Sequence, residues 1–332
     1  MSTLVKCGLM PDRANTPQVI AAHGLTPDEY QRIIQILGTA YYHPVLPLVP
    51  QRDWRAHIER WQGIGGNLFG RETFAGFWPP EMGFCMELIP SLTRCGYQYV
   101  LVDSEHLQAV TQMGWDELRF RPHLARFGGE EIIVVVRDRE LSDAQFAGME
   151  PDWFIKEVVQ RTRYCDYPPL VITCTDGENG GWFRNTAQTA NFWGGFYQPL
   201  LDRVRTDQSA GIRPIFIDEY LRVHGVYGEV SVDSGAWNTG WHDGRGFGQW
   251  TGSVGQQQAL TRVRETSERI DAACRLVVNT MRDEPGLKRQ LEEAHWHLLR
   301  AETSCNFFWG EAWIQRCHDD LDQAHRFLAA AG

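Results

Sequence analysis

The stretch YQYVLV occupies residues 97–102 and is followed at once by Asp103. A second stretch, EIIVVV, occupies residues 131–136 and is followed by Arg137 and Asp138. Both runs are short, continuous and rich in β-branched or aromatic residues, as expected for parallel strands that are covered on both faces. Polar residues directly after such strands are typical of α/β enzymes, whose active sites lie at the carboxyl ends of the strands. The two runs therefore favour an α/β enzyme.

Two shorter apolar runs extend this pattern, at residues 170–174 and 215–217. Helix-like stretches at 151–163 and 191–204 lie between the runs. Strands that alternate with helices predict an α/β fold, and at this length either a barrel or a doubly wound sheet.

Other helices are expected before and after this region. Residues 27–36 follow a helix-start pattern, and residues 51–70 have helical spacing that two glycines, Gly65 and Gly66, are expected to close. After about residue 254 the strand pattern stops, and residues 256–282 and 287–330 have helical spacing. We therefore expect a barrel-like catalytic domain over residues 1–254 and a helical subdomain over 255–332 that packs on it.

Composition narrows the function. The chain has 332 residues and a formal net charge of -10, and it contains no block of Lys and Arg, which argues against a nucleic-acid partner. No apolar run reaches 18 residues, so no membrane span is expected. The eight cysteines form no C-x-x-C pair, and the N-terminus lacks the apolar core of a secretory signal. We expect free thiols and a cytoplasmic protein.

Tryptophan is abundant, with 13 residues, and many of them crowd near glycines and carboxylates. Sugar rings stack their apolar faces on indole while their hydroxyls bind nearby carboxylates, so this combination suits a carbohydrate site. Most tryptophans are nevertheless expected to belong to the core. The tryptophans near glycines and acids are Trp78, Trp182, Trp193, Trp237, Trp241, Trp250 and Trp309.

Cleavage or transfer of a glycoside requires two carboxyl groups that flank the bond. One candidate is Glu81 in GFWPPEMG, residues 76–83, although a surface glutamate after a proline turn would look the same. The other is Asp176 in TDGENGGW, residues 175–182, although a glycine-rich loop also uses Asp for turn hydrogen bonds. The residue pattern alone does not choose the catalytic acids. Asp103, with His106 nearby, and Asp218 and Glu219 also follow apolar runs, and any of these acids could pair with Asp176.

Several phrases, in this order along the chain, resemble glycoside hydrolase family 57. The resemblance spans roughly residues 38–325. It implies an incomplete (β/α)7 barrel followed by a helical region, and a retaining enzyme acting on α-glucans, such as an amylase, a 4-α-glucanotransferase or a branching enzyme. The phrases are YHPVLPL at 42–48, FWPPE at 77–81, TDGENGGW at 175–182, DEYL at 218–221, FGQWTG at 247–252 and AETSCNFFW at 301–309.

The same resemblance implies roles for individual residues. Glu81 corresponds to the family's nucleophile and Asp176 to its general acid/base. His43, Trp182, Trp250 and Trp309 fall in segments that line the family's cleft. The candidate turns and strand ends add Trp78, Asp103, His106, Glu178 and Glu219 as further expected contacts with an α-glucan or maltooligosaccharide substrate. No cofactor is implied.

Two departures from the family pattern define the alternatives. No His-Gln-Pro-type first-strand motif precedes His43, and Cys305 stands where the family usually has an acid. A minimal or truncated member that lacks the first strands, a second chain that completes the barrel, or a glycan-binding relative without turnover would account for the first departure. A metal-dependent polysaccharide deacetylase is disfavoured, because no H-E-x-x-H pair occurs and His295 and His297 cannot face the same way on a helix. We therefore expect no metal.

Overall fold

The computed structural model describes residues 35–71, 73–174, 192–237, 246–279 and 285–331. The first predicted helix lies almost wholly outside these ranges. So do three of the predicted site residues, namely Asp176, Glu178 and Trp182.

A mixed four-stranded sheet forms the centre of the fold, with the order β1-β2-β5-β4. The strands β1, β2 and β5 are parallel, and β4 pairs antiparallel with β5 through a tight turn at Gly128 and Gly129. Of the four predicted strand runs, those at 97–102 and 131–136 are confirmed as β2 and β5, whereas the β4 hairpin strand was not predicted. The strands are β1 (Gly76–Phe77), β2 (Tyr99–Asp103), β3 (Leu107–Ala109), β4 (His123–Phe127), β5 (Glu130–Arg137) and β6 (Val230–Val232), of which β3 and β6 form a separate antiparallel pair.

Isolated bridges extend the parallel part of the sheet at both ends. Gly38 pairs in parallel with Phe77 of β1, and Ile172 pairs in parallel with Arg137 at the end of β5. The parallel segments therefore follow one another around an arc in chain order, as in a (β/α) barrel that is not closed. This is the predicted fold class, an incomplete parallel barrel followed by helices.

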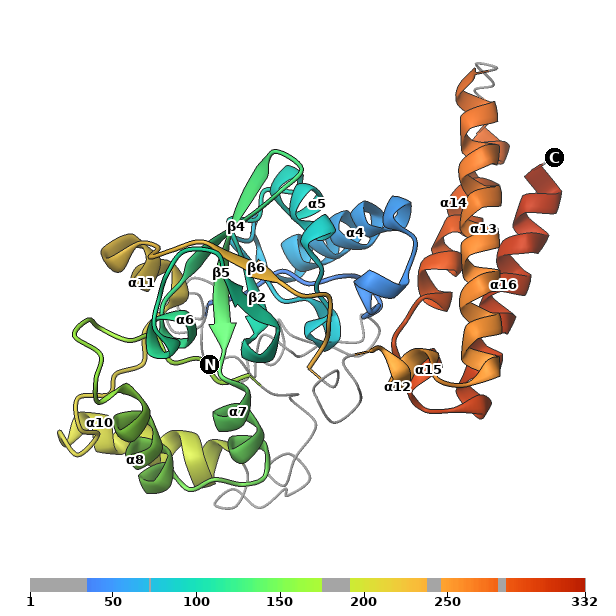
Figure 1. The fold of residues 1–332 in the computed structure, drawn as a ribbon. Coiled ribbons are helices and arrows are strands. Elements are labelled where there is room, and N and C mark those ends of the chain that lie inside the picture. Colours follow the sequence, from blue (N-terminus) through green and yellow to red (C-terminus); the bar gives the residue numbers. More distant parts are fainter. Residues whose placement is uncertain (1–34, 72, 175–191, 238–245, 280–284, 332) are drawn as a thin grey trace.

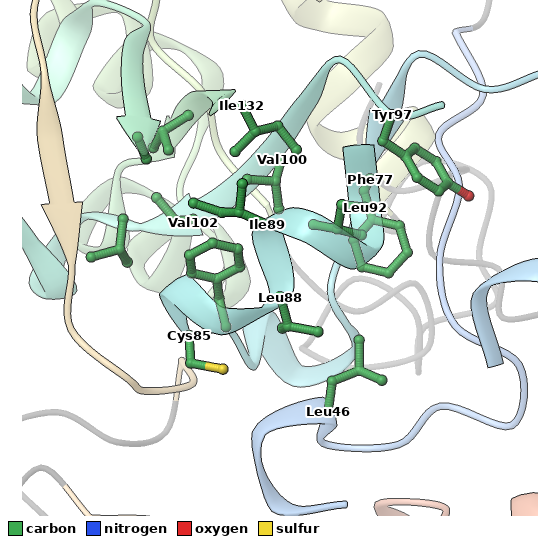
Figure 2. Packing of buried hydrophobic residues seen from close by; sticks show 14 of the residues in the cluster. Leu46, Phe77, Cys85, Leu88, Ile89, Leu92, Tyr97, Val100, Val102 and Ile132 are labelled. Atoms are coloured by element: carbon green, nitrogen blue, oxygen red, sulfur yellow. The ribbon is translucent and has the colours of Figure 1, made fainter. Parts of the chain in front are cut away.

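The central strands are buried on both faces, and each face contributes to a different core. In β2, Val100 and Val102 point to one side and Tyr99 and Leu101 to the other, as the two-residue period of a strand requires. Figure 2 shows Val100, Val102 and Ile132 beside Leu88, Ile89 and Leu92, the residues of the helical segment after β1. The opposite face packs against Trp78 and Met82, which precede and follow Glu81.

Helices surround the sheet, and the last ones form a bundle of their own. In Figure 1, α13, α14 and α16 stand together beside the sheet, and the short helices α12 and α15 lie where the bundle meets it. The helices are α4 (Gln51–Phe69), α5 (Ile89–Arg94), α6 (Trp115–Phe120), α7 (Arg139–Phe146), α8 (Pro151–Thr162), α10 (Gln198–Arg205), α11 (Ile217–His224), α12 (Gly248–Thr251), α13 (Val254–Asn279), α14 (Pro285–Ala301), α15 (Cys305–Phe308) and α16 (Glu311–Ala331). Shorter turns of helix are η1 (Leu46–Leu48), η2 (Pro80–Met82), η3 (Met86–Leu88), η4 (Ser104–His106) and a π-helical turn (Phe192–Tyr197).

The helical C-terminal third agrees with the prediction, since α13 begins at Val254. A domain boundary at this point stays a prediction. The helices are interrupted at residues 302–304 and 309–310, between α14, α15 and α16.

Two predicted elements differ from the structure. The run at residues 215–217 is not a strand, because α11 begins at Ile217 with Asp218 and Glu219 in its first turn, where acidic side chains favour a helix N-terminus. The run at 170–174 forms only the single bridge at Ile172.

The end of α4 also differs from the prediction. Gly65 and Gly66 lie inside the helix, and the residue that ends it is Gly70, whose φ of 63° is left-handed. A glycine pair alone does not end a helix when its neighbours pack, and here Gly65 lies against the Trp61 ring.

Candidate active site

Glu81 lies directly after the carboxyl end of β1, in the single 3-10 turn Pro80–Met82. Its backbone and that of Met82 are left-handed, with φ of 55° and 53°. This conformation is uncommon for residues with a Cβ and persists only where the surrounding structure fixes it, which is frequent at functional sites. Two prolines before Glu81 and the bond from Gly83 N to the Pro80 carbonyl hold the turn.

Three hydrogen-bond donors converge on the Glu81 carboxylate. The His43 ring Nε2 lies 3.0 Å from Oε1, and the Ser304 hydroxyl donates to the same oxygen at 3.0 Å. The Trp237 indole Nε1 donates to Oε2 at 2.7 Å. Hydrogen bonds to a carboxylate favour its ionised form, which is the form a nucleophile requires. The side chain remains 13% exposed, so a ligand can reach it.

The first two donors are joined to each other. The Ser304 backbone N–H donates to the His43 carbonyl at 2.9 Å, beside an antiparallel bridge between Pro44 and Thr303. Ser304 in turn accepts a hydrogen bond from the buried Trp250 indole at 2.8 Å. The break between α14 and α15 therefore places the Ser304 side chain, from the helical region, in contact with Glu81 in the turn after β1.

The third donor is fixed by the turn that carries Glu81. The Trp237 backbone N–H donates to the Glu81 carbonyl at 3.0 Å, and Gly235 pairs with Phe84 in an antiparallel bridge. Trp78 meets the Trp237 ring edge to face, with 6.2 Å between centroids. The orientation of the indole is therefore set by contacts from two sides.

A buried ion-pair cluster lies behind Trp237. The Arg137 guanidinium lies 5.6 Å from the centre of the Trp237 ring and donates to Asp103 at 2.6 Å. Arg139 donates to the other Asp103 oxygen at 2.8 Å. The His106 ring donates at 3.0 Å to the carbonyl of Ala236, the residue before Trp237. The Asp103 charge, despite burial, raises the pKa of Arg137 above its ordinary value, so the pair is ionic.

These contacts locate most of the predicted site residues. His43 contacts Glu81, whereas Trp78, Asp103, His106 and Trp250 are buried and support the residues around it. Their observed contacts are with protein, and a direct contact of any of them with substrate stays a prediction. Glu219 is exposed on α11, and Trp309 is 57% exposed after α15.

Three residues of this site were not singled out from the sequence as site residues. Ser304 lies inside a phrase that was recognised, but a serine has no distinctive pattern. Trp237 belongs to the glycine-rich stretch before α12, and Arg137 follows β5 directly. The position of Arg137 at a strand end was the available signal, and it drew attention only to the acids.

A family model, Glycosyl hydrolase family 57, matches residues 16–232, well over half of the chain. The chain belongs to glycoside hydrolase family 57. The match includes both Glu81 and Asp176, so the resemblance noted in the sequence is confirmed at the level of the family.

Curated relatives match over part of their length. A 4-alpha-glucanotransferase of Thermococcus kodakarensis is 29% identical over 189 residues, which cover 57% of this chain and 28% of that enzyme. An alpha-amylase of Pyrococcus horikoshii is 24% identical over 188 residues, with the same coverage of 57% and 28%. The matched region thus spans little more than a quarter of the length of these family 57 relatives.

Solved structures share the fold across nearly the whole chain. An exo-type maltose-forming amylase from Pyrococcus sp. ST04 superposes with a TM-score of 0.69 at 15% identity, covering 94% of this chain and 66% of that one. A GH57-type branching enzyme from Pyrococcus horikoshii gives 0.65 at 15% identity, with coverage of 95% and 67%. At these identities the likeness establishes the fold.

The described residues offer neither a metal site nor a membrane span. They contain no cluster of three or more His, Cys, Asp or Glu side chains suited to a metal ion. Within the same ranges, no helix is both long enough and apolar enough to cross a membrane.

Proposed function

We propose that this chain is a retaining glycoside hydrolase or transglycosylase that acts on α-glucans, with Glu81 as the nucleophile and Asp176 as the general acid/base. The observation that supports it best is the Glu81 carboxylate, which accepts hydrogen bonds from His43, Ser304 and Trp237 and is still accessible. The curated relatives named as a 4-alpha-glucanotransferase and an alpha-amylase support the substrate class.

In the first step, a Glu81 oxygen attacks the anomeric carbon, and the bond from that carbon to the leaving oxygen breaks. Asp176 gives its proton to the leaving oxygen, which departs as an alcohol. The product is a glycosyl ester of Glu81. As charge leaves the carboxylate, the three donors bind it less strongly, and they stabilise it again when the charge returns in the second step.

In the second step, Asp176 takes a proton from water or from a sugar hydroxyl, whose oxygen attacks the anomeric carbon. The ester bond breaks and Glu81 regains its charge. Water gives hydrolysis, and a sugar hydroxyl gives transfer. The role of Asp176 is supported by the position of Cys174, two residues before it, whose carbonyl accepts a hydrogen bond from Arg137, which also contacts Trp237.

The proposal also covers the location of the enzyme, its contacts with the glucan and a partner chain. We propose a cytoplasmic location, supported by the lack of a disulfide among the cysteines of the described ranges. We also propose that Glu178, Trp182 and Trp309 contact the glucan. Trp309 is exposed, and exposed aromatic rings stack on sugar rings. A second chain that supplies barrel elements is part of the same proposal.

The test is incubation with maltoheptaose and chromatography of the products. Shorter chains alone indicate hydrolysis, and longer chains indicate transfer. Glu81→Gln keeps the size of the side chain but removes the attacking anion, so turnover should fall by about four orders of magnitude or more. Near-normal activity in this variant would exclude Glu81, and a parent protein that binds maltoheptaose without converting it would favour the non-catalytic relative.

Asp176→Asn separates the two roles. With an aryl maltooligoside that has a good leaving group, the first step should proceed and the glycosyl ester should accumulate on Glu81, where intact-protein mass spectrometry detects it. Azide needs no base, so it should restore turnover and give a product of retained configuration. Rescue by azide of Glu81→Gln but not of Asp176→Asn would show that the two roles are reversed.

A further inference from the structure

A buried imidazole and a buried carboxyl group connect the two segments that supply donors to Glu81. His57 on α4 and Glu302 at the end of α14 are completely buried, and His57 Nε2 lies 2.6 Å from Glu302 Oε2. The other ring nitrogen, Nδ1, lies 2.7 Å from the Tyr41 carbonyl. None of the steps proposed above uses either residue.

The two ends of the hydrogen-bonded chain Tyr41–His57–Glu302 each lie two positions from a Glu81 donor. Tyr41 precedes His43 by two residues, and Glu302 precedes Ser304 by two residues. The backbone between Tyr41 and His43 needs such support, because Tyr42 and His43 are both left-handed, with φ of 57° and 61°. The Tyr41 N–H also donates to the His57 carbonyl at 3.0 Å, so Tyr41 is fixed to α4 by both backbone groups.

The hydrogen bonds that join Glu302, His57 and Tyr41 all run the same way, with Glu302 donating to His57 and His57 donating to Tyr41. A carbonyl only accepts, so His57 Nδ1 carries a proton and donates to Tyr41. Burial lowers the pKa of His57 to about 4, which leaves Nε2 without a proton at neutral pH. Burial, with the nearby Asp53 charge, raises the pKa of Glu302 well above its ordinary value. Glu302 is then a neutral acid that donates to Nε2.

The surroundings agree with a neutral pair. Asp53 lies one turn before His57 on α4 and accepts a hydrogen bond from Ser267 of α13 at 2.6 Å. His295 of α14 lies 3.8 Å from the other Asp53 oxygen, and the Arg60 charge lowers the pKa of His57 further. Burial and the charge and hydrogen bonding of Asp53 raise the pKa of Glu302, so the link from Glu302 to Tyr41 carries no charge.

We propose that Glu302 and His57 are positioning residues for the catalytic carboxylate. The chain Glu302–His57–Tyr41 fixes the spacing between the His43 and Ser304 segments, so that both donors meet at Glu81 Oε1. This inference rests on the proposed function where it names Glu81 the nucleophile, but the geometry it predicts can be measured without catalysis.

The measurement uses the Trp237 indole as a reporter. Its N–H donates to Glu81 Oε2, so its 15N–1H NMR signal should shift as Glu81 titrates. Trp237→Phe assigns the signal, and Glu81→Gln should abolish the titration. In Glu302→Ala the two Oε1 donors lose their alignment, and the midpoint of the titration should rise by about one pH unit because the ionised form loses support. Glu302→Gln keeps a donor to Nε2 and should stay near the wild-type midpoint.

Leu321→Ala is the matched control, since Leu321 is fully buried in α16 and its loss weakens the same helical bundle. It should lower stability and leave the midpoint unchanged. An unchanged midpoint in folded Glu302→Ala, or an equal rise in Leu321→Ala, would overturn the proposal. If Glu302→Ala does not fold, Glu302→Asp carries the test, because it shortens the side chain by one carbon and should give the same rise.

Activity provides the second readout. The kcat/KM of Glu302→Ala for the aryl maltooligoside should fall about tenfold more at the acidic end of the profile than at its plateau, and Glu302→Gln should restore the profile. A parent enzyme without activity would defeat the proposed function alone, because the indole titration would still report the alignment of the donors.

Discussion

The backbone of Glu81 and the backbone of its partner His43 are both left-handed, although neither residue is a glycine. Each such position costs about 1–2 kcal/mol in an isolated chain. The cost is offset by hydrogen bonds from residues far away in sequence, chiefly Trp237 and Ser304. At this scale the site is a strained turn held by tertiary contacts. The stability of its left-handed conformation depends on single hydrogen-bond donors.

The Trp237 indole N–H is one of these donors. Trp237→Phe removes it but keeps an aromatic ring in the contact with Trp78. A hydrogen bond to a charged group contributes about 1.5–3 kcal/mol, so kcat/KM for an α-glucan should fall roughly 10- to 100-fold. The control is Trp153→Phe, because Trp153 is exposed on α8 and belongs to no site contact, and its kinetics should not change. Equal losses in both variants would argue against a role for the Trp237 donor.

At the scale of single elements, α4 places two of the residues that matter for the site, Asp53 and His57, on one buried face. Their spacing of one helical turn brings both toward α13 and α14. The helix must also end at a defined residue so that the chain can turn back to β1. Gly70 performs this function by adopting a left-handed conformation that a residue with a Cβ rarely adopts.

Two glycines of α4 should respond oppositely to alanine. At Gly70 nothing obstructs a Cβ, but φ is 63°, so Gly70→Ala should lower the free energy of unfolding by about 1 kcal/mol. Gly63 is exposed inside the helix and equally unobstructed, so Gly63→Ala should raise it by about 0.5–1 kcal/mol. Urea denaturation of the two variants and the parent measures whether the free energy of unfolding rises or falls in each. A stabilised Gly70→Ala protein would show that the helix end is not fixed as described.

At the scale of the whole molecule, the sheet and the helical bundle are linked through buried polar groups as well as through apolar packing. The Trp250 indole bonds Ser304, Asp53 bonds Ser267, and His57 bonds Glu302. Buried polar groups that lose their partners are destabilising by several kcal/mol, so these links specify how the bundle sits on the sheet.

The His57–Glu302 pair makes stability depend on pH. On unfolding, Glu302 regains an ordinary pKa of 4.5 and His57 one of 6.5. The raised pKa of folded Glu302 gives stability that is present below pH 4.5 and is lost as the pH rises. The lowered pKa of folded His57, about 4, gives stability that is present above 6.5 and is lost as the pH falls toward 4. Between 4.5 and 6.5 the proton that Glu302 releases on unfolding is taken up by His57, so the two slopes cancel.

Above pH 6.5 only the Glu302 contribution remains. The free energy of unfolding of the parent should then fall, relative to Glu302→Gln, by about 1.4 kcal/mol per pH unit while Glu302 stays protonated in the folded state. Urea denaturation of both proteins at pH 6.5, 7 and 7.5 measures this difference. A constant difference across the range would mean that Glu302 is ionised in the folded protein.

The sequence by itself determined the class of fold and the family. Continuous apolar runs identified β2 and β5 because parallel strands buried on both faces contain little else, and helical spacing identified the C-terminal bundle. The proline-rich phrase around Glu81 identified the acid, since it departs from the surrounding periodicity and resembles a family motif. Patterns of this kind are local, so they can be read along the chain.

The tertiary structure alone decided which residues surround Glu81. Its partners are 38, 156 and 223 residues away in sequence, and no local pattern records such distances. It also decided that Asp103, an acid at a strand end, is neutralised by Arg137 and Arg139, because the charges meet only when β2 and β5 pair. The run at 215–217 was misread for the same reason: an apolar triplet becomes a strand only where a neighbouring strand accepts its hydrogen bonds, and here the first turn of α11 takes its place.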